Sequence, residues 1–398
     1  MEPTFFDPAS ENRSGRKFAQ IISRLKEPKV YGSLFVIVLV IAVFTSIAYR
    51  YTVASKKNGS ADQPVKKAGL SLFNPITSKI DRKKRYTSSL DGVQYDDEAA
   101  ANRHALGVII ENHTDARPQS GLADAAVVYE AIAEGGITRF LAIFGPKYPS
   151  RVGPIRSART YYLDWCLEYD CFFAHVGGNI DALDLIPKIG IKDLDQFRYG
   201  TGAYGKTYYR VPRTNIATEH TMFGDPSKLY GLAKNNGWDQ TGGHPNVSFK
   251  DDIEKSARPT SQIVNIEISN PQFNTSWSYD PVINSYARTM GGLAHKDGTT
   301  GNQIKSKTLI VQEMNSRATT TRINELGFIM DTVGSGKAKI FSDGKRIDGS
   351  WKKTSQTART IFSDENGDEI RYNPGQRWIT VVSPDTAVVT TQPTPQAQ

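Results

Sequence analysis

Arginine recurs between residues 111 and 220 where glycine and proline shape the backbone, and its planar guanidinium group suits carboxylates and phosphates. Arg156 and Arg159 belong to the stretch VGPIRSAR, residues 152–159, which directly precedes a predicted helix. Unpaired N–H groups make a helix start partly positive, so basic side chains there oppose the helix dipole unless an anion compensates them. The residues predicted to bind an anionic ligand are Arg117, Gln119, Ser120, Arg139, Arg156, Ser157 and Arg159.

The same arginines have a second interpretation that requires no ligand. Nearby glutamates could neutralise them in an internal ion-pair network, whose members orient one another. The glutamates in question are Glu111, Glu130 and Glu134. The anion beside VGPIRSAR is therefore either a ligand or a carboxylate of the chain itself, and the sequence leaves both interpretations open.

Acid–base catalysis is a further kind of chemistry for which this region holds the residues. It needs two titratable groups that reach one bond and whose pKa values are pushed apart. The candidates are Glu130, Glu134, His175 and His220. His175 ends an apolar run before two glycines, and open α/β sheets often hold ligands at the carboxyl ends of their strands. A buried, hydrogen-bonded histidine fits the same position equally well.

A metal site is the weaker interpretation of the alternating residues Glu111, His113 and Asp115. If a strand continued through them, the three side chains would share one face and could bind a metal or act as acid and base. The pattern is short, and a solvated strand end is the favoured interpretation. We therefore predict no metal and no cofactor.

Two literal motif matches lack the elements that their chemistry requires. GTGAYGKT, residues 200–207, matches a phosphate-binding loop, which needs a strand before it and a helix after it. Pro212 and β-prone tyrosines follow instead, so a flexible glycine loop is predicted. Ser350 and Lys353 have the S-x-x-K spacing of penicillin-recognising enzymes, but the companion motifs are missing.

Residues 31–49 carry no charged side chain and are long enough to cross a hydrocarbon core as a helix. Five basic residues precede this span closely and three follow it, which favours a cytoplasmic N-terminus. We predict a cytoplasmic segment at 1–30, a single transmembrane helix at 31–50 and an extracytoplasmic remainder. A cleavable signal peptide is the alternative, and it would put the remainder on the same side of the membrane.

Beyond the span, composition divides the chain into a stalk, two folded regions and a tail. Residues 51–100 are rich in Lys, Ser, Gly, Asp and Pro, as in a flexible stalk. Apolar runs alternate with helical patterns over 101–245, which predicts a mixed α/β domain. Short apolar segments over 258–384 predict a mostly β domain, and 385–398 are expected to be disordered. The fold class is thus expected to be α+β.

Local patterns predict the elements that carry the candidate residues. Residues 125–145 are typical of two strands joined by a tight turn at Glu134–Gly136. Residues 171–178 are typical of a buried strand, and Asp343-Gly344 and Asn366-Gly367 of hairpin turns. The predicted helices cover residues 157–170, 180–187 and 226–237. On one regular helix, the five-residue spacing of the two cysteines would turn them about 140° apart, so we expect two buried thiols, at Cys166 and Cys171.

The balance of 49 basic to 41 acidic residues, a net charge of +8, favours polyanions or acidic surfaces as partners. Nucleic acid is an unlikely one, because the aromatic residues are not interleaved with basic ones in any recognised module. Anionic lipid and cell-wall polymers fit the charge equally well, so composition by itself does not select among them.

Several stretches resemble the YerB-like lipoproteins, an uncharacterised bacterial family built from an N-terminal and a C-terminal domain. In the first region they are ENHTDARPQSGLADAAVVYEAIAEGGITRFLAIF, VGPIRSAR and HVGG, followed by His220. In the second region they are YARTMGGLAH, GSWKKTSQTARTIFSDENGDEI and NPGQRWITVV. The resemblance covers about residues 90–383 and implies a surface-exposed envelope protein with an α/β and a β-rich domain.

The chain departs from this family in two places. Members are usually held by a lipid on an N-terminal cysteine, whereas a predicted membrane helix takes that role here. Thr221 follows His220, whereas the family tends to have asparagine at that position. Of this pair, only His220 matches the family's pattern. The family has no established reaction, and the resemblance implies none for this chain.

Together these features favour a membrane-anchored envelope protein that binds an anionic or carbohydrate cell-wall component through Arg139, Arg156 and Arg159. One alternative is a cell-wall hydrolase or transferase that uses the glutamate and histidine candidates as acid and base. Another is a scaffold that recruits envelope-synthesis proteins through the β-rich region.

Overall fold

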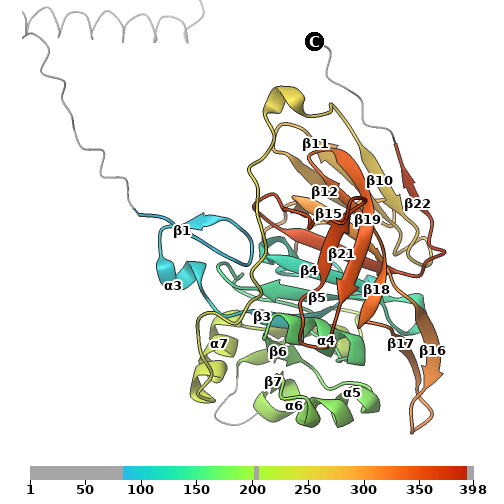
Figure 1. Cartoon of the computed structure of the whole chain (residues 1–398). Helices are drawn as coiled ribbons and strands as arrows, with labels where there is room; N and C mark the ends of the chain where they lie inside the picture. Colours follow the sequence, from blue (N-terminus) through green and yellow to red (C-terminus); the bar gives the residue numbers. More distant parts are fainter. Residues whose placement is uncertain (1–83, 201–205, 392–398) are drawn as a thin grey trace, which may run out of the picture. The chain divides into compact units, whose positions relative to one another are not determined.

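The computed structural model describes residues 84–200 and 206–391, and its central feature is a mixed sheet of ten strands (Figure 1). In spatial order the strands are β20 (Ile361–Asp364), β19 (Lys345–Lys353), β18 (Gly334–Ser342), β15 (Thr308–Glu313), β21 (Arg377–Val382), β4 (Val127–Ile132), β5 (Thr138–Phe144), β3 (Leu106–Glu111), β6 (Phe172–His175) and β7 (Lys192–Asp195). β3, β6 and β7 run parallel. The hairpin expected within residues 125–145 is present as β4 and β5.

Strands from the two regions distinguished by composition meet within this sheet. β21 lies parallel to β4, with Ile379 opposite Tyr129, and β15 lies parallel to β21. The first region is mixed α/β and the second is mostly β, as predicted. Because their strands are hydrogen-bonded to one another, the two regions share one sheet.

A second sheet of six strands and three two-stranded ribbons complete the β-structure described. The second sheet contains β13 (Leu293–Ala294), β12 (Ser285–Met290), β11 (Thr275–Asp280), β10 (Ile263–Ile266) and β22 (Val388–Thr390), with β14 (Lys305–Ser306) beside β12. The ribbons pair β1 (Tyr86–Thr87) with β2 (Gln94–Tyr95), β8 (Tyr208–Arg210) with β9 (Met222–Gly224), and β16 (Ser316–Thr320) with β17 (Leu326–Met330). β18 and β19 join through Asp343-Gly344, as the turn chemistry predicts.

The helices are short and follow the predicted positions with trimmed ends. The α-helices are α3 (Glu98–Ala101), α4 (Thr160–Glu168), α5 (Ile180–Leu185), α6 (Gln196–Tyr199) and α7 (Pro226–Asn235). The 3₁₀ turns are η1 (Thr114–Ala116), η2 (Leu122–Asp124), η3 (Glu134–Gly136), η4 (Ile186–Lys188), η6 (Thr218–His220) and η7 (Lys255–Ala257). Asp225 caps α7 by accepting from the N–H groups of Ser227 and Lys228, and Pro226 opens the helix.

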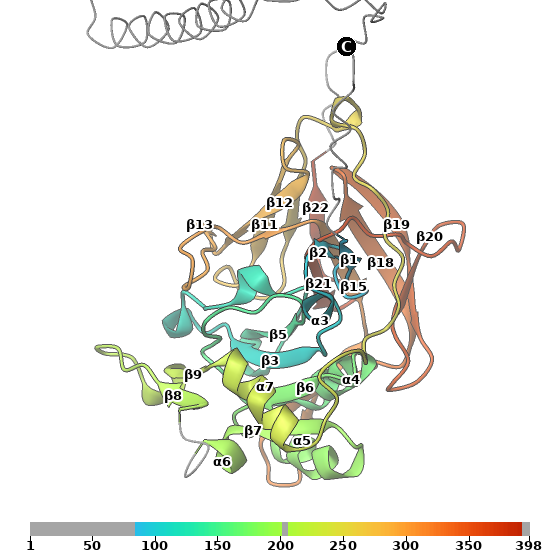
Figure 2. The same cartoon turned by 90° about the vertical axis from the view of Figure 1, so that its left-hand side faces the viewer.

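Both faces of the ten-stranded sheet are buried at its strands β3 and β5. Val108 and Ile110 pack with α7 and the six-stranded sheet, whereas Ile109 between them packs on the opposite face with Trp165 of α4. Figure 2 shows α7 in front of this part of the sheet. Strands buried on both faces are apolar throughout rather than alternating, which explains the continuous apolar runs of β3 and β5.

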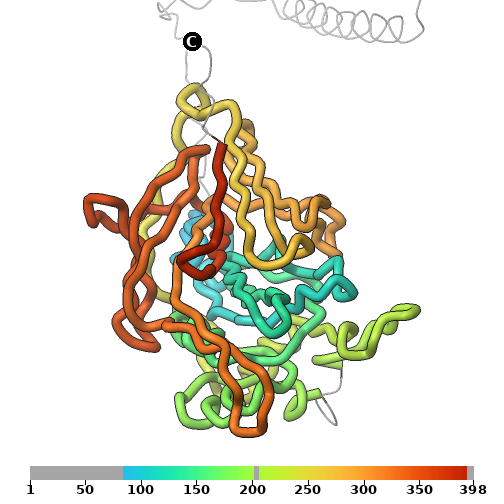
Figure 3. The backbone as a smooth tube through the Cα atoms, turned by 90° about the vertical axis from the view of Figure 1, so that its right-hand side faces the viewer, coloured from blue at the N-terminus to red at the C-terminus, as the bar shows by residue number. Residues whose placement is uncertain are grey.

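Two segments expected to be flexible are partly folded. Residues 84–100 were assigned to the stalk, yet Leu90 is buried and its carbonyl accepts a hydrogen bond of 2.9 Å from Arg377 Nη2. Within the tail predicted at 385–398, β22 pairs with β10, and Figure 3 shows this last red strand beside the yellow one. The exposed edge of β10 offers unpaired backbone groups, which compensates the low apolar content of the tail.

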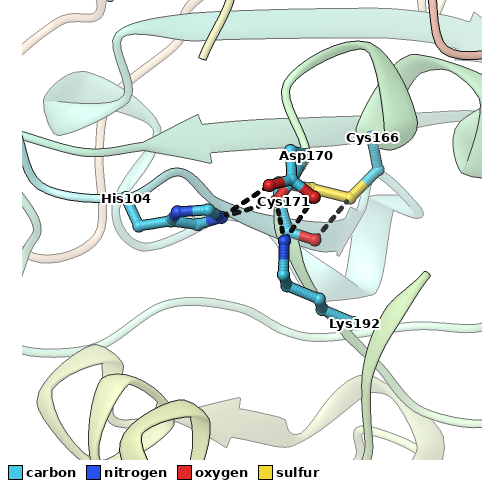
Figure 4. The surroundings of a disulfide bond; sticks show 5 residues. All are labelled: His104, Cys166, Asp170, Cys171 and Lys192. Carbon is cyan, nitrogen blue, oxygen red and sulfur yellow. Dashed lines mark hydrogen bonds and ion pairs between the residues drawn. A yellow bond between two sulfur atoms is a disulfide. The ribbon is translucent and has the colours of Figure 1, made fainter. Parts of the chain in front are cut away.

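The expectation of two separate thiols was wrong, because Cys166 and Cys171 form a disulfide (Figure 4). The regular-helix geometry does not apply, since α4 ends at Glu168. Asp170 then adopts a left-handed conformation with φ 49°, which turns the chain back and brings the two Cα atoms to 5.3 Å. A disulfide requires Cα atoms within about 7 Å, and the helix end meets that condition.

Several predicted features fall wholly or partly outside the described residues. They are the cytoplasmic segment 1–30, the membrane helix 31–50, most of the stalk, and residues 201–205 and 392–398. Within the described ranges, none of the helices has both the length and the apolar character to cross a membrane.

The structure around the two literal motifs agrees with their rejection. The glycine loop that begins at Gly200 has α6 before it and strand β8 after it, the reverse of the order in a phosphate-binding loop. Ser350 and Lys353 both lie on β19, so they do not open a helix.

Candidate functional site

The surface is hollowed at the carboxyl ends of the parallel strands β6 and β7. The hollow has a volume of about 540 Å³. Its lining residues are Ile155, Arg156, Ser157, Val176, Gly177, Gly178, Leu183, Asp195, Phe197, Arg210, Glu219 and Met222. Carboxyl ends of parallel strands are where open α/β sheets place their ligand sites, so this hollow is the candidate site.

Arg156 reaches the hollow from an extended segment that runs between the ends of β3 and β6. Its N–H donates to Ile109 O at 3.0 Å, and its carbonyl accepts from Val176 N at 3.0 Å. Helix α4 begins only at Thr160, with Arg159 as its N-cap. Residues 152–158 of VGPIRSAR are thus part of an extended segment, and the conflict with the helix dipole is confined to Arg159.

The guanidinium group of Arg156 has an ionic partner at Nε and, among the described residues, none at its two terminal nitrogens. Its Nε lies 3.0 Å from Glu111 Oε1, and three quarters of the side chain is covered. Within the described residues its two terminal nitrogens have no hydrogen bond or ion pair to the protein. An arginine that lines a hollow and has both terminal nitrogens unpaired can bind a carboxylate or phosphate in a bidentate way.

Glu111 also binds His220, a pairing that the sequence did not indicate. His220 Nδ1 lies 2.9 Å from Glu111 Oε2, and both side chains are nearly buried. The Nδ1–H therefore donates to the carboxylate, which leaves Nε2 with its lone pair. The two residues are 109 positions apart, so no spacing pattern could have revealed the pair.

The remaining polar groups of the hollow divide into structural and exposed ones. Asp195 caps α6 by accepting from Phe197 N and also accepts from Gly177 N at 2.8 Å. Gly177 adopts φ 55°, a conformation that favours glycine, so the close turn after β6 depends on it. Arg210 and Glu219 are exposed, and the ring of Phe197 is 72% exposed at the rim.

Two of the predicted ligand-binding arginines form ion pairs with an internal carboxylate. They are Arg139 and Arg159, and their partner is Glu134. Arg159 donates to both oxygens of Glu134, with Nη2 at 2.6 Å from Oε2, and Arg139 Nη2 lies 3.4 Å from the same oxygen. Burial raises the pKa of Glu134, but the hydrogen bonds and charges of the two arginines outweigh it and lower the pKa overall. The internal-network interpretation thus describes these two arginines.

Three other predicted ligand-binding residues lie away from the hollow. Arg117 Nη2 donates to Gln272 O at 3.0 Å. Ser120 is buried and accepts from Arg151 Nε at 3.1 Å. Gln119 is fully buried and donates to Glu111 O at 3.0 Å. Of the predicted set, Arg156 and Ser157 line the hollow.

Two of the acid–base candidates, Glu130 and His175, are each held by other groups of the protein. Glu130 is fully buried, and both its oxygens accept from Arg288. His175 is fully buried, with Nδ1 at 2.7 Å from Gly177 O and Nε2 at 2.7 Å from Asp193 Oδ1. Both ring nitrogens of His175 are therefore occupied, and it has the structural role that the sequence left open.

A buried polar chain links Gln119 to Glu130 through residues of the second region. His295 Nε2 lies 2.8 Å from Gln119 Oε1, and Arg288 Nε donates to His295 Nδ1 at 3.0 Å. Arg288 Nη2 then donates to Glu130 at 2.8 and 2.9 Å. Burial and then the charges of Arg288 and Arg117 lower the pKa of His295 well below 6.5, so the neutral ring accepts from Arg288.

This neutral histidine is expected to make the fold sensitive to acid. Below pH 6.5 a histidine in the unfolded chain takes up a proton that the folded His295 does not, so the free energy of unfolding falls with falling pH. The slope from this group is at most about 1.4 kcal/mol per pH unit. Urea unfolding between pH 4.5 and 8 measures it, with His295→Gln as the comparison. An equal slope in the variant would assign the acid sensitivity to other groups.

A second hollow, of about 600 Å³, lies near the end of β15. Its lining residues are Glu313, Asn315, Asp331, Val333, Gly334, Ser335, Gly336, Lys337, Trp351, Pro384 and Asp385. It contains none of the residues that the sequence singled out, and three carboxylates against one lysine make it unsuited to an anion.

Comparison with known proteins places the chain in a family. The N-terminal domain model of a family described as Protein of unknown function (DUF3048) matches residues 90–239, and its C-terminal domain model matches 264–379. A protein named "Putative lipoprotein YerB", from Bacillus subtilis (strain 168), is 28% identical over 307 residues, 76% of this chain and 88% of that protein. The crystal structure of YerB protein from Bacillus subtilis is similar with a TM-score of 0.65 and 24% identity, covering 76% of this chain and 99% of that one, which is a likeness of fold. The chain therefore belongs to the DUF3048 family of two-domain, YerB-like proteins, whose function is not known.

Proposed function

We propose that the chain is an envelope protein that binds an anionic carbohydrate of the cell wall in the hollow beside Arg156. Residues 31–50 anchor it in the membrane, the N-terminus is cytoplasmic, and the folded part is extracytoplasmic. The observation that carries the proposal is the guanidinium group of Arg156, a residue that lines the hollow, whose Nε pairs with Glu111 while its terminal nitrogens have no partner among the described residues.

Two observations support the location. The uncharged segment 31–49 has the length and composition of a membrane span. The relative from Bacillus subtilis is named as a lipoprotein, a class of proteins attached to the membrane by a lipid. A transmembrane helix in this chain would replace the lipid and leave the folded part on the same side.

The lining of the hollow supports an acidic sugar as the ligand. Its volume of about 540 Å³ lies within the range of roughly 300–1,000 Å³ that is common for small-molecule sites. Arg156 and Arg210 supply guanidinium groups for an anionic substituent, and the exposed ring of Phe197 supplies a flat apolar face for a sugar ring. Glu219 and Ser157 add polar groups that can bind hydroxyls.

Binding to cell-wall fragments tests the proposal. Isothermal titration of the full-length protein with a muramyl disaccharide–peptide, which carries carboxylates, is expected to give saturable binding that weakens as salt is added. A neutral chitin disaccharide is expected to bind more weakly. Arg156→Gln should weaken binding of the acidic fragment roughly 10- to 100-fold, because charge-assisted hydrogen bonds contribute about 1.5–3 kcal/mol.

Arg317→Gln is the matched control for this experiment. Arg317 is an exposed arginine on β16 that pairs with Asp331 at 3.0 Å, and it does not line the hollow. Its replacement changes the net charge equally and should leave binding intact. If Arg156→Gln, shown by circular dichroism to be folded, bound the acidic fragment as tightly as the native protein, the proposal would be wrong.

A further inference from the structure

Three side chains able to ligate a metal converge where the turns η1 and η6 meet. A ligand atom from each of His113, Asp115 and His220 lies within 4.8 Å of the other two. The sequence grouped Glu111 with His113 and Asp115 on a continuous strand, but β3 ends at Glu111 and η1 follows. The chain therefore turns, and His220 takes the place that alternation had assigned to Glu111.

Glu111 is not one of these three residues, but it binds His220, which is. Its Oε2 accepts from His220 Nδ1 at 2.9 Å, which fixes the ring and leaves Nε2 as the unprotonated nitrogen. Histidine ligands of metals almost always donate their other ring N–H to a carboxylate, a carbonyl or water. The other oxygen of Glu111 is held by Arg156 at 3.0 Å, so the carboxylate is fixed in turn.

The two turns are joined by groups that are not themselves ligands. Arg213 donates to the carbonyl of Asp115, to Arg117 O at 3.1 Å and to His220 O at 3.2 Å. The imidazole rings of His113 and His220 are stacked with centroids 4.5 Å apart and an interplanar angle of 11°, so their in-plane lone pairs lie in parallel planes and the ring of His113 must turn before both can bind one ion. Asp115 N donates to His113 Nδ1 at 3.2 Å, a hydrogen bond that this turn of the ring would break. The backbone of the two turns is thus held in place, while the ring of His113 has to move for a metal to bind.

Two imidazoles and one carboxylate suit a divalent transition metal such as Zn²⁺. Tetrahedral ligands at about 2.0–2.1 Å from zinc lie roughly 3.3 Å from one another, so the atoms now within 4.8 Å need to close by about 1.5 Å. The side chains of His113 and Asp115, which are 33% and 45% exposed, are the groups that would move. Three protein ligands leave a fourth position open, as in catalytic zinc sites.

We propose that His113, Asp115 and His220 bind a divalent transition metal of the zinc class, with Glu111 orienting His220. The three ligand residues do not line the hollow proposed for the carbohydrate, although Glu111 binds both His220 and Arg156. The test of this site therefore uses the metal alone.

Two measurements on the full-length protein test the site. Competition with a chromogenic chelator gives the zinc affinity, and mass spectrometry gives the content of bound metal. One Zn²⁺ per chain is expected. His113→Asn and Asp115→Asn should each weaken binding at least 100-fold, since each removes a ligand. Glu111→Gln should retain one equivalent with affinity roughly 10- to 100-fold lower, because it alters only the support of His220.

Glu365→Gln is the matched control, because Glu365 is an exposed carboxylate that belongs neither to the cluster nor to the hollow. It should bind zinc like the native protein. Visible absorption of Co²⁺ bound in place of zinc reports the ligand geometry separately from folding. Native protein that binds less than one equivalent, or folded His113→Asn and Asp115→Asn that bind as tightly as native, would overturn the proposal.

Discussion

Replacing Arg288 by methionine is expected to lower the free energy of unfolding by about 3–5 kcal/mol. Arg288 and Glu130 are both fully buried, and Nη2 of the arginine donates to the two carboxylate oxygens at 2.8 and 2.9 Å. The variant leaves a carboxylate in the core with Trp378 Nε1 at 3.0 Å and the Thr138 hydroxyl at 3.3 Å as its remaining donors. Neither donor supplies the lost charge.

The effect should be large because this pair joins the two sequence regions. Glu130 lies on β4 and Arg288 on β12, and the guanidinium group stacks 4.3 Å from the ring centre of Trp378 on β21. Methionine cannot replace either the charge or the planar stacking. Urea unfolding of the full-length protein, followed by tryptophan fluorescence, measures the change.

Two variants control for the interpretation. Arg317→Ala removes an arginine from an exposed pair, whose side chains are 61% and 48% exposed, and should cost no more than about 1 kcal/mol. The double variant Arg288→Met/Glu130→Leu should be more stable than Arg288→Met, because no unpaired charge remains. Losses that simply add would mean that Arg288 acts through packing and not through its charge.

Local patterns predicted those elements whose formation depends on neighbouring residues. The hairpin β4–β5 and its turn at Glu134–Gly136 follow from continuous apolar runs around two glycines. Helix α7 follows from Asp225 as cap and Pro226 as first residue. In both, the residues that determine the element lie within it, so the sequence suffices.

Long-range pairings could not be predicted, because no local signal encodes them. β21 lies beside β4 although Trp378 and Glu130 are 248 positions apart. The Glu111–His220 pair is likewise formed across 109 positions. The disulfide was missed for a local reason, since a single left-handed residue, Asp170, ended the helix sooner than its pattern indicated.

The ligand site stays a prediction, but the structure shows which of the predicted arginines have an internal partner. The sequence indicated that arginines near 152–159 meet an anion, and left open whether that anion is internal. Arg159, at the start of the helix, forms an ion pair with Glu134. Arg156 pairs with Glu111 only through Nε, so its terminal nitrogens have no partner among the described residues. That an arginine here binds a ligand stays a prediction, and which arginine lines the hollow depends on how 152–158 runs between β3 and β6.

Glu134→Gln is expected to cost about 3 kcal/mol or more of unfolding free energy, because it leaves two nearly buried guanidinium groups without their shared carboxylate. The side chains of Arg139 and Arg159 are 11% and 10% exposed, and burial followed by the charge of Arg159 lowers the pKa of Arg139. The variant removes the only compensation for that repulsion among the described residues, since the other contacts of both arginines are to backbone carbonyls.

The same substitution is expected to affect the hollow, because Arg139 and Arg159 bind the backbone of the segment that carries Arg156. Arg139 donates to Ser157 O at 3.2 Å and Arg159 to Ala158 O at 2.7 Å, so the network fixes the segment that carries Arg156. Adding Arg139→Met to Glu134→Gln should restore part of the stability, because one unpaired charge is removed. Urea unfolding measures both variants against Glu219→Gln, an exposed carboxylate whose loss should change stability by about 0.5 kcal/mol or less. A cost for Glu134→Gln as small as that of the control would show that water, and not Glu134, compensates these arginines.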